Sequence, residues 1–134
     1  MLIDPNIFLE ILLKQERSGE SKQFLEKIRK GEICCYISDF NIDSILIILE
    51  KRTKSTVVME NFISSILEYR GLSIYFVTIG DRLKALEHME NYGLDFEDSL
   101  TLQAAISSGC SKIVSFDRDF DGLQIGRVEP KDLI

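Results

Sequence analysis

Residues 93–120 read GLDFEDSLTLQAAISSGCSKIVSFDRDF, and this stretch decides the fold. Its first part predicts a helix over residues 95–108 that ends at Gly109, because glycine readily adopts the left-handed backbone of a helix C-terminus. The run KIVSF at 112–116 predicts a buried strand, with Asp117 directly after it. A helix that leads at once into a short buried strand is typical of the parallel sheet of an α/β domain.

The same alternation extends through the rest of the chain. Short apolar or β-branched runs predict strands at residues 1–3, 33–37 and 73–77, and residues 125–128 are a candidate fifth strand. Apolar residues at helical spacing predict the helices: one ending before a polar connection at 15–20, one around 24–30, one capped by Ser38 or Asp39, and two more at 55–69 and 80–92. We therefore expect a single α/β domain over residues 1–134, with a four- to five-stranded, mainly parallel sheet covered on both faces.

Aspartates stand where the predicted strands end and where one helix begins. Asp4 follows the first strand, Asp117 and then Asp119 follow the fourth, and Asp95 and Asp98 share one face of the helix before it. Functional groups gather at the carboxyl ends of parallel strands, so three segments are expected to present carboxylates to one rim. Such oxygen ligands suit Mg²⁺ or Mn²⁺, which can activate water for attack on a phosphodiester.

Each acid also has a purely structural interpretation. Asp95 suits the N-cap of its helix, Asp4 can cap the helix that Pro5 begins, and the acids after the fourth strand are typical of a turn. The only histidine, His88, lies in a polar stretch, which argues against a zinc site or histidine-based nucleophilic catalysis.

Composition narrows the class of protein. The net charge of −6 argues against strong passive binding of a polyanion, although carboxylates that converge on a cation are one source of such an excess. No apolar run is long enough to span a membrane, and the first residues lack the features of a secretory signal. The adjacent Cys34 and Cys35 are typical of reduced thiols, so we expect a cytoplasmic protein.

The motifs resemble those of the PIN domain family along essentially the whole chain. The resemblance rests on LIDPNIFL at 2–9, GLDFEDSL at 93–100, the run 104–110 and KIVSFDRDF at 112–120. It implies a Rossmann-like three-layer α/β/α fold and an Mg²⁺- or Mn²⁺-dependent endoribonuclease, frequently the toxin of a toxin–antitoxin pair. The resemblance also implies site residues. Asp4, Asp98 and Asp117 match the metal-binding acids, Asn6 and Ser115 match polar positioning residues, and Asp95 is acidic in some members.

One position departs from the family pattern. The family usually carries a glutamate on the helix after the second strand, and an ungapped match from Ser38 puts Ser44 there. Asp43 and Asp39 are the nearest acids, and a small rotation of the helix brings Asp43 to the rim. We therefore count Asp43 as a candidate catalytic residue, with loss of one ligand as the alternative.

Two other classes and several partners follow from the same residues. An inactive PIN-like interaction module keeps the fold, whereas a phosphoacceptor receiver domain is disfavoured because no aspartate follows the third strand at 77–79. RNA is the expected substrate, held through the metal and local cations such as Arg118 and the pair at 51–52. Surplus apolar residues in the helices at 40–49 and 62–67 indicate a homodimer or simple core packing, and an antitoxin protein is the other expected partner.

Overall fold

The computed structural model describes residues 1–134 and confirms the predicted parallel α/β fold. Five strands form one sheet in the order β3-β2-β1-β4-β5, and every pair of neighbours is parallel. The strands are β1 (Leu2–Ile3), β2 (Cys35–Ser38), β3 (Leu72–Tyr75), β4 (Lys112–Val114) and β5 (Gly126–Val128). Strand β1 therefore lies at the centre of the sheet, between β2 and β4, which are separated by more than 70 residues in the sequence.

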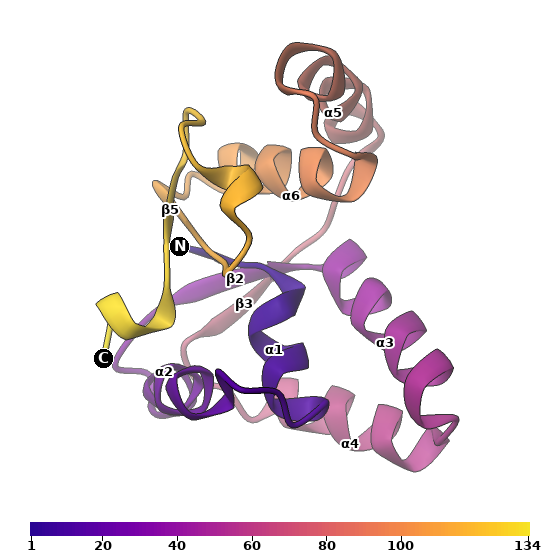
Figure 1. The fold of residues 1–134 in the computed structure, drawn as a ribbon, viewed down its shortest axis with the longest axis vertical. Helices are drawn as coiled ribbons and strands as arrows, with labels where there is room; N and C mark the ends of the chain where they lie inside the picture. The colour runs from indigo at the N-terminus through magenta and orange to yellow at the C-terminus, as the bar shows by residue number, and fades with distance from the viewer.

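Helices cover both faces of the sheet, which confirms the three-layer α/β/α architecture (Figure 1). One face carries α1 (Pro5–Leu12), α2 (Ser18–Lys30), α3 (Asp39–Thr53) and α4 (Thr56–Leu67). The other face carries α6 (Phe96–Ser107), on which α5 (Ile79–Tyr92) packs. Two short 3₁₀ turns, η1 (Arg118–Phe120) and η2 (Pro130–Asp132), complete the chain. None of the helices combines the length and apolar character that crossing a membrane requires.

The central strands have their side chains in two separate cores. Ile3 and Val114 pack among α1 to α4, whereas Leu2 and Ile113 pack against α6, because successive residues of a strand point to opposite faces. All four are fully buried. Burial of this kind stabilises the fold by about 2 kcal/mol per aliphatic side chain, so the residues that follow β1 and β4 extend from a rigid support.

Some predicted boundaries were wrong because contacts between distant segments set them. Strand β3 stops at residue 75 rather than 77, since the backbone N–H of Val77 donates to the Asp39 carboxylate at 2.9 Å. Strand β4 stops at Val114, so Asp117 stands beyond a short loop rather than directly after the strand. Helix α2 begins at Ser18, inside the predicted connection, and β2 runs over 35–38 rather than 33–37.

Candidate metal centre

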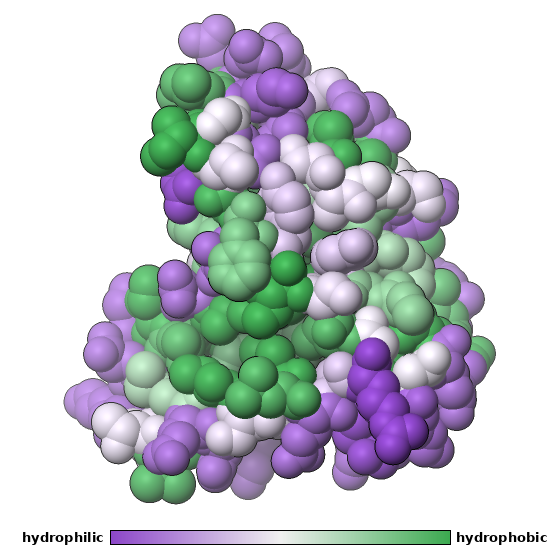
Figure 2. Space-filling view, turned by 180° about the vertical axis from the view of Figure 1, so that it is seen from behind, coloured by the Kyte–Doolittle hydropathy of each residue, from purple (hydrophilic) through white to green (hydrophobic).

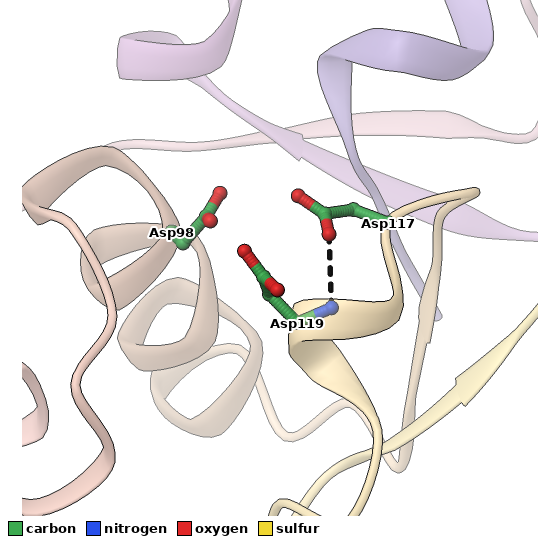
Figure 3. A group of neighbouring side chains, drawn as sticks. All are labelled: Asp98, Asp117 and Asp119. Atoms are coloured by element: carbon green, nitrogen blue, oxygen red, sulfur yellow. Dashed lines mark hydrogen bonds between the residues drawn. The ribbon is translucent and has the colours of Figure 1, made fainter.

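Three carboxylates converge at the edge of the sheet where β1 and β4 end. Asp98 comes from the first turn of α6, and Asp117 and Asp119 come from the segment after β4. Each offers one oxygen atom, and these three atoms lie within 4.8 Å of one another. Figure 3 shows the three side chains turned toward a common space. Of the three predicted metal ligands, Asp98 and Asp117 belong to this group and Asp4 does not; Asp119, which does, was predicted only as a neighbouring acid.

Local capping contacts fix the position of these acids. The Asp95 side chain caps α6 by accepting the backbone N–H of Asp98 at 2.8 Å. The Asp117 carboxylate accepts the backbone N–H of Asp119 at 2.9 Å, which forms the turn η1 (Figure 3). Asp95 is therefore the N-cap that the sequence allowed, and it has an exposed side chain. Because Asp117 caps the 3₁₀ turn that contains Asp119, the two carboxylates lie on the side of the turn that faces Asp98.

Asp4 lies beneath the three converging carboxylates in a polar network that joins β1 to β4. Its side chain is only 7% exposed and accepts a hydrogen bond from the Ser115 hydroxyl at 2.7 Å. The same hydroxyl oxygen accepts from the Asn6 amide at 3.0 Å and from the backbone N–H of Asp117 at 3.0 Å. The predicted positioning residues, Asn6 and Ser115, thus contact each other and connect Asp4 to the loop that carries Asp117.

The centre holds more negative charge than its surroundings compensate. Burial raises the pKa of Asp4 to about 7 despite the Ser115 hydrogen bond, and the charges of Asp98 and Asp117 add to the rise. Burial, followed by the charges of Asp95 and Asp117, raises the pKa of Asp98 to about 7 as well. No lysine or arginine forms a salt bridge with any of these acids.

A divalent cation fits this donor set. Carboxylate oxygens are the ligands that Mg²⁺ and Mn²⁺ prefer, and the mutual repulsion of these acids is relieved when a cation lies among them. Asp98, Asp117 and Asp119 would hold the ion, with Asp4 close beneath it.

The acids expected from α3 lie elsewhere. Asp43 is exposed and is not part of the cluster, although it lines a pocket of about 300 Å³ together with Ser44 and Glu97. Asp39 is occupied by the backbone of residue 77, as described above, and does not face the cluster. The structure therefore gives no support to a ligand role for either acid. Glu97, which was not among the predicted site residues, is likewise exposed and lies outside the cluster.

Comparison with known proteins agrees with this geometry. The PIN domain family profile matches residues 1–125. Among solved structures, a toxin–antitoxin complex from Klebsiella pneumoniae superposes with a TM-score of 0.72 and 20% identity over 96% of each chain. VapBC2 from Rickettsia felis, bound to a promoter DNA fragment, gives 0.72 and 16% over 96% of each chain. The sarcin–ricin-loop-cleaving toxin VapC20 from Mycobacterium tuberculosis gives 0.71 and 14%, over 87% of this chain and 88% of that one. At such low sequence identity, the structural similarity shows a shared fold alone. No curated protein sequence matches.

Proposed function

This chain belongs to the PIN domain family, and from that premise we propose that it is an endoribonuclease that depends on Mg²⁺ or Mn²⁺. The observation that carries the proposal is the convergence of Asp98, Asp117 and Asp119 above the buried Asp4, without a neutralising lysine or arginine. Phosphodiester hydrolysis needs a site that binds a divalent ion beside a phosphate, and this is such a donor set.

Each residue has a defined task in this proposal. A bound ion supplies water activation and neutralises charge on the scissile phosphate. Asp98, Asp117 and Asp119 hold the ion at the rim, and Asp4 adds negative charge beneath it. Ser115 and Asn6 fix the orientation of Asp4 through their shared hydrogen bonds, and Asp95 fixes the first turn of α6. Exposed Arg118, next to Asp117, is a local cation for the RNA backbone in an otherwise acidic chain.

The direct test is metal-dependent cleavage of RNA by the purified protein, free of any partner. We expect cleavage with Mn²⁺ that EDTA abolishes, and a loss of at least about 100-fold in Asp98→Asn, since one carboxylate orients the ion that stabilises the developing charge. Calorimetry should show weaker Mn²⁺ binding in the same variant. Glu50→Gln is the control, because Glu50 is an exposed acid of α3 that lies outside the cluster. Unchanged Mn²⁺ binding in Asp98→Asn removes that residue from the site.

The partners are a second part of the proposal. Two of the similar structures are complexes of a toxin with its antitoxin, so we propose an antitoxin protein as the partner of this chain in the cytoplasm. Co-purification from the native host tests this. Recovery of the chain alone, together with no cleavage and no toxicity on expression, favours an inactive PIN-like interaction module instead.

An exposed apolar surface supports the further proposal of a homodimer. Ile63 and Leu67 on α4, Phe76 after β3, and Ile79 and Leu83 on α5 are all exposed. Figure 2 shows apolar side chains gathered in the lower half of the face on which α4 lies, and a separate, smaller apolar group near the upper end, where α5 lies. Exposed apolar side chains that lie together are a feature of protein interfaces, so a second copy of the chain is proposed to cover the α4 surface. Light scattering tests the dimer, and a clean mass of 15.3 kDa at micromolar concentration contradicts it.

A further inference from the structure

An arginine from β5 contacts both ends of the loop that carries Asp117 and Asp119. One guanidinium nitrogen of Arg127 donates a hydrogen bond to the carbonyl oxygen of Ser115, before the loop, at 3.0 Å. Another nitrogen donates to the carboxylate of Asp121, after the loop, at 2.7 Å. The guanidinium therefore spans residues 116–120 and limits how far the two ends of this loop can move apart.

The carboxylate of Glu129 holds this arginine in place. The Glu129 side chain is 13% exposed, and one of its oxygens accepts a hydrogen bond from Arg127 at 2.9 Å. The other oxygen accepts a hydrogen bond from Arg17 and lies 3.1 Å from the amine of Lys131. The Arg17 guanidinium lies over the ring of Phe116, 3.9 Å from its centroid. Glu129 is thus fixed from several sides, and each of the two arginines that it pairs with also contacts the loop.

The ion pairs of this network balance one another. Its three cations pair with three carboxylates: Arg17, Arg127 and Lys131 with Glu20, Asp121 and Glu129. None of the three cations forms a salt bridge with the acids of the metal centre. Hydrogen bonds from Arg17 and then Arg127 lower the pKa of Glu129 to about 2, so its carboxylate is ionised at neutral pH. The network therefore fixes the loop and leaves the charge of the centre available to a cation.

We propose that Glu129 is a positioning residue of the metal centre, which acts through Arg127 on the loop of residues 116–120. By closing this loop, the pair keeps the carboxylates of Asp117 and Asp119 directed toward Asp98. The inference rests on the proposed metal-dependent function and adds two residues to it. Both lie beyond residues 1–125, which the PIN domain profile matches.

Hydrogen exchange, followed by NMR on the metal-free full chain, tests the effect on the loop without any metal. The backbone N–H groups of residues 117–121 should exchange at least about 5-fold faster in Glu129→Gln than in the wild type, because local opening depends on the contacts that close a segment. Asp81→Asn is the matched control: it also changes a buried, hydrogen-bonded acid, but one that contacts β3, the start of α5 and the end of α6. Unchanged exchange of residues 117–121 in Glu129→Gln overturns the inference.

Calorimetry with Mn²⁺ on the full chain without RNA tests the effect on the centre. Glu129→Gln should weaken Mn²⁺ binding by about 10-fold, the lower end of the range for residues that orient metal ligands. Asp81→Asn should lose stability in urea but keep its Mn²⁺ affinity. If Glu129→Gln behaves like this control, its role is stability alone and the inference is wrong.

A double variant tests the route through Arg127. Because Glu129 acts through Arg127, adding Glu129→Gln to Arg127→Met should weaken Mn²⁺ binding by no more than about 2-fold further. A further loss as large as that of Glu129→Gln alone overturns this route. Failure of the proposed function gives a different result, in which Asp98→Asn retains full Mn²⁺ binding, and the inference then falls with it.

Discussion

Replacing Asp4 by asparagine should stabilise the metal-free protein at alkaline pH and weaken its Mn²⁺ binding. Asp4 is 7% exposed, and burial raises the pKa of its carboxyl group from 3.8 to about 7. A raised pKa means that the folded state prefers the protonated form. The stabilisation associated with that proton is fully present below pH 3.8 and is lost as the pH rises through 7.

The size of the effect follows from the same values. Each unit of pKa corresponds to about 1.4 kcal/mol, so ionised Asp4 destabilises the folded state by about 4 kcal/mol at pH 8. Asparagine removes the charge, and its side-chain oxygen can still accept the Ser115 hydrogen bond. We therefore expect Asp4→Asn to exceed the wild type by up to about 4 kcal/mol at pH 8, and by under about 2 kcal/mol at pH 5.

Urea unfolding in EDTA at pH 5 and pH 8 measures these differences, with Glu50→Gln as the control that changes an exposed acid. Saturating Mn²⁺ should reverse the order of stability, because a ligand stabilises only the protein that binds it. An Asp4→Asn protein that is less stable than the wild type at pH 8 in EDTA would refute the reasoning, since it would mean that the ionised carboxylate is well accommodated.

Three further predictions concern residues that support the centre or the fold. Arg127→Met removes donors to the Ser115 carbonyl and to two carboxylates, and should destabilise the protein by about 1–3 kcal/mol in urea and weaken Mn²⁺ binding in calorimetry. Gly71→Ala puts a Cβ 2.1 Å from a backbone carbonyl oxygen and should destabilise by more than about 2 kcal/mol, whereas Gly19→Ala in α2, with nothing within 4 Å, should be neutral or stabilising. Burial acts to raise the pKa of Asp81, but hydrogen bonds outweigh it and lower the pKa to about 2. The ionised carboxylate therefore stabilises the fold above pH 3.8, and Asp81→Asn should be about 2 kcal/mol less stable than the wild type in urea at pH 7. Between pH 4 and pH 2 the variant should lose less stability than the wild type does.

The sheet could be predicted from the sequence because its signals are local. Short apolar runs and the glycines at 31, 93 and 109, which adopt positive φ, mark strands and helix ends without reference to the rest of the chain. The end of β3 could not be predicted, since it depends on a contact between the Asp39 carboxylate of α3 and the backbone N–H of Val77, after β3. Contacts of this kind exist only once the sheet has assembled.

The residues of the metal centre also fall into those that the sequence predicts and those that it does not. Strand ends and helix starts predicted the region in which Asp4, Asp98 and Asp117 lie, because parallel strands end at a common edge. Asp119 joins them through a capped 3₁₀ turn, whose geometry the spacing alone does not determine. Asp43 was favoured for its closeness to the apolar stripe of α3, yet the helix turns the polar stripe of Asn41 and Ser44 inward and leaves Asp43 exposed.

The position of β1 between β2 and β4 has a consequence for the time at which the protein becomes active. Asp4 is synthesised 111 residues before its partner Ser115. Protein synthesis adds about 5–20 residues per second, so that interval is roughly 5–20 s. During this time β1 has no β4 beside it, and the metal centre is incomplete. A chain truncated before Ser115 retains Asp4 and Asp98 but lacks Asp117 and Asp119. The proposed metal centre can therefore bind its ion only after residues 115–119 have been synthesised.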